Sequence, residues 1–359
     1  MISTLTTTRA GATEQAVSPT LSVCIATHER PTLLEVTLGH LASQEELPDE
    51  VVVSDSSAGS ATAKVVERFR GVHPCIEVKH VKSGNKALPW QRWWAFLHSR
   101  GDVILFLDDD IRLVPRALRR LKELYRQQEG TGQPIIGAGL LISLEDGVLW
   151  ERKRRSLTER ILATSLRKPG ALTPGGISVS PSDLPRGSTT AVEWLSGGTM
   201  SLRRSALAAI GEMQGLFGLY DLQIGCQEDA VLSSMAARLT GGRLVILAEE
   251  LAFHPPLARA IRTADAHAGW RKGLRETLGR AYAMRWLATS RRSLVEDWFR
   301  TVVLEVLRAG ASVIRRPLSW VDWNRLAGGV YGAIVGLCVW KRIPDQPQQR
   351  IASIPWLMR

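Results

Sequence analysis

Cysteine is scarce in this sequence, and its scarcity excludes two kinds of small scaffold. The chain of 359 residues has four cysteines and no CxxC pair; they are Cys24, Cys75, Cys226 and Cys338. Disulfide frameworks and zinc knuckles need cysteines at close, repeated spacings, so we expect neither. A chain without such cross-links suits a reducing compartment and depends on its apolar core.

Long apolar runs are also lacking. Residues 1–20 are polar and have no signal-peptide core, so we expect them to be a disordered lead-in. Near the other end, Leu326–Trp340 has 15 residues without charge, whereas a membrane span needs about 20. This glycine-rich stretch therefore suits an interfacial or re-entrant helix better than a span.

Apolar, β-branched runs alternate with helical patterns over the first part of the chain. We expect strands at Leu21–Ala26, Val51–Val53, Ile76–Val81 and Val103–Leu107, and helices at Thr32–Ser43, Ala61–Phe69, Pro89–His98 and Pro115–Arg126. This alternation predicts an α/β fold with a mostly parallel, Rossmann-like sheet that has helices on both faces. In such sheets, ligands bind beyond the carboxyl ends of the strands.

The later elements are spaced less regularly. We expect strands at Ile135–Ser143 and Arg243–Leu247 and a helix at Glu228–Leu239. Between them, Lys168–Thr190 is rich in proline, glycine and serine, which predicts a mobile loop.

Three aspartates follow the fourth expected strand, in the sequence GDVILFLDDDIR at residues 101–112. Side chains alternate along an extended chain, so Asp108 and Asp110 are expected to point the same way and Asp109 the other. Two carboxylates on one side repel each other unless a cation lies between them. Their oxygen atoms favour Mn²⁺ or Mg²⁺, which would neutralise a diphosphate. A solvated acidic turn or a helix cap is the alternative.

Further motifs accompany these aspartates in order: LSVCIATHERP at 21–31, VVVSDSS at 51–57, Arg92, GDVILFLDDD at 101–110, WLSGGTMSLRR at 194–204, QED at 227–229 and AFHP at 252–255. With these motifs, residues 21–256 resemble glycosyltransferase family 2, whose members are inverting sugar transferases of the GT-A fold. The resemblance implies a GT-A domain at 21–256, a nucleotide-diphospho-sugar donor and a bound Mn²⁺ or Mg²⁺.

The resemblance also implies roles on the donor side. Asp55 would hold the nucleobase, Asp108 would contact the ribose or the sugar, and Asp110 would bind the metal ion. Asp109 would also belong to the nucleotide-sugar site. An Asx-turn is the alternative for Asp55, and a helix cap is the alternative for Asp109. His254 would be a second metal ligand through its neutral imidazole, unless it is a structural histidine.

On the acceptor side, Asp229 resembles the family's general base, which accepts the acceptor hydroxyl's proton as that oxygen attacks C1. The alternative for Glu228 and Asp229 is the acidic first turn of a helix, which the helix dipole favours. Gly197 and Gly198 would let the backbone approach donor or acceptor closely, or form a plain turn. Arg92 would contact the diphosphate or lie at the surface.

Two loops depart from the family's usual pattern. Thr27-His28-Glu29-Arg30 stands where Tyr-Asn is commoner, and Ser54-Asp55-Ser56 replaces Asp-Asp-Gly. The resemblance still implies that Thr27 and Glu29 contact the nucleotide, but it leaves the base identity open. Nearby, WQRWW at 90–94 would stack on a sugar or base, or form a buried helix face.

The excess of basic charge lies in the last 103 residues. Residues 1–256 carry 28 Lys/Arg and 28 Asp/Glu, whereas residues 257–359 carry 18 Lys/Arg, 7 Asp/Glu and seven of the twelve tryptophans. Helical spacing and a capping box at Ser293 and Glu296 predict amphipathic helices there. Arginine and tryptophan favour an anionic membrane surface. The alternatives are that these helices cover the catalytic domain or form an oligomer interface.

These observations predict an inverting glycosyltransferase with a helical C-terminal extension at 257–359. We expect it to be cytoplasmic and peripheral on the inner face of the cell membrane, where it would extend a glycan or lipid-linked acceptor in cell-surface polysaccharide synthesis. No nucleic-acid-binding motif accompanies the basic charge, so we expect no nucleic acid partner.

Two alternative functions remain. A sugar-1-phosphate nucleotidyltransferase would share the strand-end carboxylates but would need a glycine-rich basic loop where this chain has THERP. A catalytically inactive, membrane-associated scaffold is the other alternative, and the presence of Asp55, Asp108, Asp110 and Asp229 argues against it.

Overall fold

The computed structural model describes residues 19–127, 133–144, 167–255 and 266–339. The first elements in chain order are β1 (Leu21–Thr27), α1 (Pro31–Ala42), β2 (Glu50–Asp55), α2 (Ala61–Val72), β3 (Glu77–Lys82), α3 (Leu88–His98), β4 (Val103–Asp108), β5 (Arg112–Leu113), α4 (Ala117–Arg126) and β6 (Ile135–Leu144). They are followed by β7 (Thr189–Val192), β8 (Thr199–Arg203), α6 (Arg204–Ile210), α7 (Gln214–Asp221), α8 (Glu228–Thr240) and β9 (Arg243–His254). The last are α9 (Ala266–Leu274), the π-helical turn η2 (Arg275–Gly279), α10 (Arg280–Leu287), α11 (Arg291–Arg315) and α12 (Trp320–Val339).

In the described ranges, the strands form one nine-stranded sheet with the order β3-β2-β1-β4-β8-β6-β9-β5, and β7 pairs with β9. β3, β2, β1 and β4 run parallel, as the alternation of strands and helices predicts. β8 is antiparallel to both of its neighbours, so the sheet is mixed beyond β4. The α/β fold is thereby confirmed, with its parallel half at the N-terminal end of the chain.

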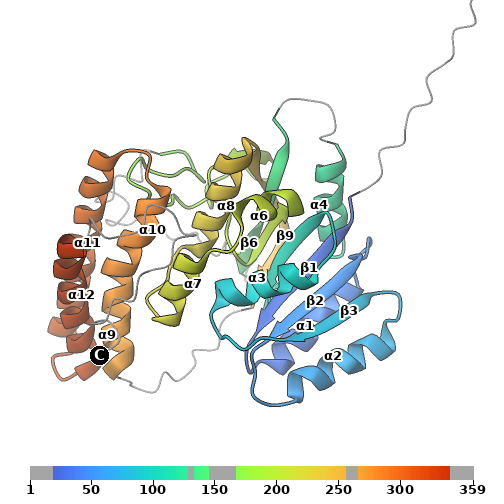
Figure 1. Ribbon diagram of the computed structural model, residues 1–359, viewed down its shortest axis with the longest axis horizontal. Helices are drawn as coiled ribbons and strands as arrows, with labels where there is room; N and C mark the ends of the chain where they lie inside the picture. Colours follow the sequence, from blue (N-terminus) through green and yellow to red (C-terminus); the bar gives the residue numbers. More distant parts are fainter. Residues whose placement is uncertain (1–18, 128–132, 145–166, 256–265, 340–359) are drawn as a thin grey trace, which may run out of the picture.

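Helices cover both faces of this sheet (Figure 1). Alternate residues of a strand point to opposite faces, so Val23 and Ile25 share a core with α1, α2 and α4. Cys24, between them, belongs to the other core, to which α3, α6, α7 and α8 contribute. Both faces are therefore buried, as the continuous apolar runs of the central strands require.

The strand register brings three loops together at one edge of the sheet. Thr27 at the end of β1 pairs with Asp55 of β2, and Ala26 pairs with Asp108 of β4. The loops that follow these strands therefore meet at the carboxyl edge, where parallel α/β sheets bind ligands.

Two connecting segments differ from their predictions. The stretch Lys168–Thr190, expected to be a mobile loop, is packed: Ile177 and Val179 are buried, and Thr173 Oγ1 donates to Asp297 Oδ2 of α11 at 2.7 Å. The strand expected at Arg243–Leu247 continues to His254 as β9, because its later residues pair with β6 and β5. The helices α6 and α7 were not predicted.

The C-terminal helices lie beside α7 and α8, at the end of the molecule away from β3 (Figure 1). Leu278, Tyr282 and Trp286 are buried in the same core as residues of α8. Their four-residue repeat is longer than an α-helical turn, and η2 supplies the wider turn that keeps them on one face. These helices therefore cover one side of the α/β part of the chain, as one of the sequence alternatives proposed.

The helix α12 packs through glycines rather than through large apolar side chains. A Cβ at Gly328 would lie 2.4 Å from the carbonyl oxygen of Trp270, and one at Gly332 would lie 2.3 Å from Thr277 Oγ1. Glycine at these positions lets α12 approach α9 and η2 closely. The glycine-rich stretch predicted as an interfacial helix is thus one side of a helix–helix contact.

The N-terminus of α11 also differs from its prediction. Ser290 is the N-cap residue, and its Oγ accepts the backbone N–H of Ser293 at 3.3 Å. Ser293 itself lies inside the helix, so the capping box assigned to it is wrong.

As for membrane spans, none of the helices in the described ranges is both long enough and apolar enough to form one.

Candidate active site

Arg92 of α3 joins the carboxyl edge of the sheet to the start of α8. Its Nη2 donates to Asp108 Oδ1 and to the carbonyl oxygen of Gly197, each at 2.9 Å, and its Nη1 donates to Glu228 Oε1 at 3.3 Å. The surface position considered for Arg92 is wrong, because its side chain is only 5% exposed. Burial alone would lower the pKa of Arg92, but Asp108 and Glu228 raise it above its ordinary value.

Asp109 and Asp110 follow β4 in a turn, and both carboxylates form an ion pair with Arg30. Arg30 Nη1 lies 3.2 Å from both Asp109 Oδ1 and Asp110 Oδ2, and Thr27 Oγ1 donates to Asp109 Oδ2 at 2.7 Å. The predicted alternation of the three aspartates is wrong, because β4 ends at Asp108. Asp109 is no helix cap either, since α4 begins further along the chain. Burial raises the pKa of Asp109 to about 6.

His254 lies beside the last of these aspartates, because β9 extends past the predicted end of the strand. Its Nε2 is 3.5 Å from Asp110 Oδ1. No cluster of three or more His, Cys, Asp or Glu side chains that could hold a metal ion is found among the described residues. The pair fits an ion that takes its other ligands from water and a bound diphosphate, as Mg²⁺ commonly does. Arg30 is half exposed, so it can withdraw from Asp110 without opening the core.

Asp55 is completely buried at the end of β2, and its carboxylate is engaged. Oδ1 accepts the Ser57 N–H at 2.8 Å, which is the Asx-turn considered from the sequence. Oδ2 lies 2.8 Å from Lys82 Nζ and 3.0 Å from His80 Nε2. Burial alone would raise the pKa of Asp55, but these partners lower it below its ordinary value. A ligand would meet Lys82 first, because that side chain is half exposed.

Glu29 ties the loop after β1 to the loop after β2. Its backbone N–H donates to Ser57 Oγ at 2.7 Å, and its Oε1 accepts the Ala58 N–H at 2.6 Å. Its φ of 54° is rare outside glycine. The two loops that depart from the family pattern thus form one hydrogen-bonded surface at the strand ends.

Asp229 lies in the first turn of α8 and is held by two backbone groups. Gly197 N–H donates to its Oδ2 at 2.9 Å, and Ala230 N–H donates to its Oδ1 at 2.8 Å. Burial and the adjacent carboxylate of Glu228 raise the pKa of Asp229 to about 7, despite these hydrogen bonds. The carboxylate is therefore fixed in orientation and poised to bind a proton near neutral pH.

Close packing explains the two glycines before β8. A Cβ at Gly197 would lie 2.7 Å from Arg92 Nη1, and one at Gly198 would lie 2.9 Å from Ile142 Cδ1 and 3.4 Å from Asp108 Oδ2. The carbonyl oxygen of Gly198 accepts the Asp108 N–H at 3.1 Å. Gly197 and Gly198 thus form a turn, as one of the sequence alternatives expected, and this turn is buried against Arg92 and Asp108.

The structure brings most of the predicted residues together around one centre: Thr27, Arg92, Asp108, Asp109, Asp110, Gly197, Gly198, Asp229 and His254. Glu29 and Asp55 form a neighbouring cluster with Ser57. Glu228 and Tyr220, which were not predicted as site residues, belong to the centre, since the Tyr220 hydroxyl donates to Glu228. The acidic pair in QED was the available signal for Glu228, whereas nothing local marks Tyr220.

Comparisons with known proteins concern the family and the fold of this chain. Residues 22–168 match the family model of Glycosyl transferase family 2, whereas no curated protein matches the chain. The crystal structure of GalNAc-T7 with UDP, GalNAc and Mn²⁺ is similar, with a TM-score of 0.50 and 16% identity, over 79% of this chain and 54% of that chain. The mannosyltransferase PcManGT from Pyrobaculum calidifontis, in complex with GDP-Man and Mn²⁺, has a TM-score of 0.49 and 17% identity, over 91% and 89% of the two chains. The likeness to the GalNAc-T7 structure concerns the GT-A-type fold.

Proposed function

Because residues 22–168 identify this chain as a glycosyltransferase of family 2, we propose that it moves a sugar, with inversion, from a nucleotide-diphospho-sugar to a hydroxyl group. We propose a glycan or a lipid-linked saccharide in cell-surface polysaccharide synthesis as the acceptor. The observation that carries the proposal is Asp229: a fixed, partly buried carboxylate with a pKa of about 7, linked through Arg92 to the strand-end Asp108.

Asp229 is the general base in this proposal. Its two oxygens are oriented by the N–H groups of Gly197 and Ala230. As the acceptor oxygen forms its bond to C1, the hydroxyl proton passes to the carboxylate, and the bond from C1 to the diphosphate oxygen breaks with its electron pair on the diphosphate. A base with a pKa near the working pH is suited to this transfer.

The donor side is assigned to the sheet edge. Asp108 would contact the ribose or the sugar through its Oδ2, since Oδ1 is bound to Arg92. Asp110 and His254 would hold Mn²⁺ or Mg²⁺, which when bound stabilises the negative charge of the departing diphosphate. Asp55 would act at the nucleobase through Lys82, because its own carboxylate is fully buried.

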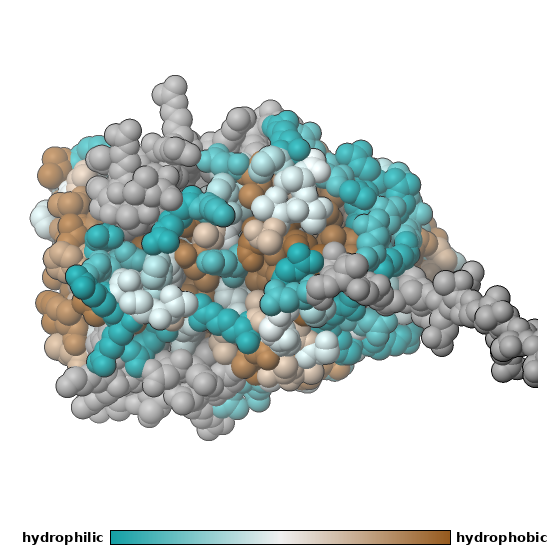
Figure 2. All heavy atoms as spheres, turned by 90° about the horizontal axis from the view of Figure 1, so that it is seen from above, coloured by the Kyte–Doolittle hydropathy of each residue, from teal (hydrophilic) through white to brown (hydrophobic). Residues whose placement is uncertain are grey.

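The proposal also places the enzyme at a membrane surface. Large apolar side chains are exposed along one stripe of α11, in the connection that follows it and along α12. We call this set the apolar face, and it comprises Val295, Phe299, Leu307, Ile314, Leu318, Trp320, Trp323, Ile334 and Leu337. Figure 2 shows hydrophobic side chains gathered at the end of the molecule that these helices form. Exposed apolar patches of this kind mark interaction surfaces, and the surrounding arginines favour an anionic bilayer.

Two assays test the function. Release of nucleoside diphosphate from UDP- and GDP-linked sugars, with and without Mn²⁺, should show metal-dependent turnover that Asp229→Ala abolishes. No turnover with any nucleotide-sugar, or full turnover of the variant, would contradict the assignment of the base.

Flotation with anionic phosphatidylglycerol vesicles tests the membrane surface. The variant Phe299→Ser/Leu307→Ser/Leu337→Ser should stay unbound while the wild type floats. Substitutions are preferable to removing residues 257–359, because the C-terminal helices share a core with α8. Equal flotation of both proteins, or a wild type that forms a stable dimer and does not float, would contradict membrane docking.

A further inference from the structure

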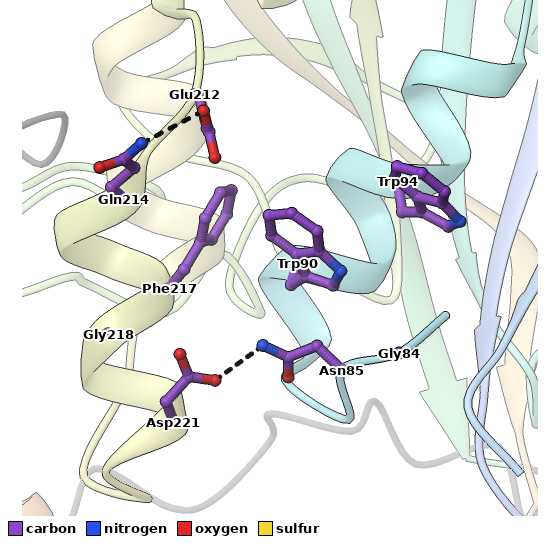
Figure 3. A pocket seen from close by; sticks show the side chains of 9 residues that line it. All are labelled: Gly84, Asn85, Trp90, Trp94, Glu212, Gln214, Phe217, Gly218 and Asp221. Carbon is purple, nitrogen blue, oxygen red and sulfur yellow. Dashed lines mark hydrogen bonds between the residues drawn. The ribbon is translucent and has the colours of Figure 1, made fainter. Parts of the chain in front are cut away.

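A cavity of about 450 Å³ lies between α3 and α7, beside the candidate active site. Figure 3 shows Trp90 and Trp94 one turn apart on α3, with Phe217 and Asp221 on the facing helix α7. Of the tryptophans in WQRWW, Trp90 and Trp93 pack against the core, as the buried-face alternative expected, while Trp90 and Trp94 also line this open space.

The rings of the two tryptophans are stacked in parallel, and their orientation is fixed by neighbouring groups. Their rings are nearly parallel, with an interplanar angle of 13° and centroids 6.2 Å apart. Phe217 meets Trp90 edge-on at 5.4 Å, and the Trp94 indole N–H donates to the carbonyl oxygen of Lys82 at 3.0 Å. The indoles are thus positioned before any ligand arrives, which reduces the entropy lost on binding.

Polar side chains surround this aromatic surface. Asn85 Nδ2 donates to Asp221 Oδ1 at 2.8 Å, and Gln214 Nε2 donates to Glu212 Oε2 at 3.3 Å. Among the described residues that line the cavity, none is lysine or arginine, and two are acidic. A diphosphate would find no cation here, whereas a neutral sugar offers C–H groups to an indole face and hydroxyls to carboxylate and amide groups.

A second cavity, of about 670 Å³, adjoins the first. It shares Gly84, Asn85 and Asp221 with the first and is also lined by Tyr220. The Tyr220 hydroxyl donates to Glu228, which adjoins the proposed base. A chain several sugars long could therefore extend from the indoles to the reacting hydroxyl.

We propose that Trp90, Trp94 and Asp221 form a binding subsite for neutral sugar residues of the acceptor, set back from the sugar that reacts. This inference rests on the proposed function, since it supplies the acceptor side of the same reaction. The subsite acts on binding and not on chemistry: its loss should weaken the acceptor's affinity while leaving hydrolysis of the donor by water intact.

Isothermal titration with three neutral tetrasaccharides, from maltose-, cellobiose- and chitobiose-type series, tests the subsite directly. At least one should bind the wild type, and Trp90→Ala should weaken that binding at least tenfold. Trp90→Phe keeps an aromatic face and should retain most of the affinity, which separates loss of stacking from loss of folding. Leu97→Ala, at an exposed residue of the same helix, is the matched control and should bind like the wild type.

Donor hydrolysis, measured on the same samples, separates the two proposals. Binding that depends on Trp90, with hydrolysis unchanged by Trp90→Ala, supports the subsite. If none of the tetrasaccharides binds, or if Trp90→Ala binds as tightly as the wild type, the subsite is refuted even where hydrolysis occurs. If saccharides bind but no nucleotide-sugar is hydrolysed, the subsite stands as a saccharide site and the proposed function fails.

Discussion

Asp229→Asn tests the chemistry and the electrostatics of the site in one variant. General-base catalysis contributes about 10²–10⁴-fold, so we expect kcat to fall within that range. In the wild type, kcat/KM should fall tenfold for each pH unit below about 7, because the protonated Asp229 carboxyl cannot accept a proton. The exposed Asp183→Asn provides the matched control and should leave both the rate and its pH profile unchanged.

The same variant should change how stability depends on pH. The unfolded chain loses the Asp229 proton near its ordinary pKa of 3.8, whereas the folded protein keeps it until about 7. The folded state therefore binds more protons between these values, and its stability falls as pH rises through that window. Asp229→Asn removes this loss.

The magnitude follows from the size of the pKa shift. A shift from 3.8 to about 7 corresponds to at most about 4 kcal/mol, and solvent at this partly buried group reduces it to about 2–4 kcal/mol. Asparagine also turns its NH₂ toward one of the two backbone N–H groups that the carboxylate now accepts, at a cost of about 1–3 kcal/mol. That cost is the same at every pH. Only the change with pH in the difference between the two unfolding free energies therefore reports the burial of the charge.

Urea denaturation of both proteins from pH 4 to pH 8 provides the measurement. The difference in unfolding free energy should move in favour of the variant by about 2–4 kcal/mol as pH rises. Parallel curves would refute the raised pKa of Asp229, and a variant with wild-type turnover would refute its role as the base.

Three further predictions concern Asp110, Lys82 and Gly332. Asp110→Asn should abolish the rise in melting temperature that Mn²⁺ and a nucleotide-sugar produce in the wild type, which differential scanning fluorimetry would show; an undiminished rise would exclude Asp110 as a ligand. Lys82→Met leaves the buried Asp55 carboxylate with one fewer partner and should lower the unfolding free energy by about 1–3 kcal/mol at pH 7. The loss should shrink as the pH falls, because Lys82 helps to lower the pKa of Asp55 and the carboxyl of the variant binds a proton more readily; a loss that is the same at every pH would contradict this. Gly332→Val places its Cβ against Thr277 Oγ1 at 2.3 Å and should destabilise the protein by about 1–3 kcal/mol, whereas the same change at Gly329, where a Cβ meets no atom within 4 Å, should cost less; equal losses would show that the close contact is not what matters.

The sequence predicts the parallel half of this fold well, because the apolar runs of its strands and the turn residues between them are local properties of the chain. Apolar runs of three to five residues indicate β1, β2 and β4, and the carboxyl ends of β2 and β4 carry Asp55 and Asp108 to one edge. The antiparallel insertion of β8 and the extension of β9 to His254 depend on pairing between distant segments. No local pattern encodes such pairing, so these features lay beyond sequence reasoning.

The candidate site was likewise predictable only in part. The residue types were predictable, but their partners were not. From the sequence, Arg92 could equally be a surface residue or a site residue, and only the fold brings Asp108 and Glu228 against it. The alternation rule failed at Asp109 and Asp110 because the strand ends before them. Side-chain direction in a turn is set by the contacts available, here to Arg30, and not by the period of the preceding strand.

The buried guanidinium of Arg92 makes the two halves of the site one unit. It binds both Asp108 and Glu228, which the proposed function assigns to the donor and the acceptor side, and it helps to keep the pKa of Asp229 from rising further. Removing it would leave Asp108 and Glu228 without a cation in a partly buried site, so the damage would reach both substrates. The effects of substitutions at Arg92 and Asp229 should therefore not add, because both act on the same network of charges. One side chain of α3 thus links Asp108 to the start of α8, and the same helix carries the tryptophans of the neighbouring cavity.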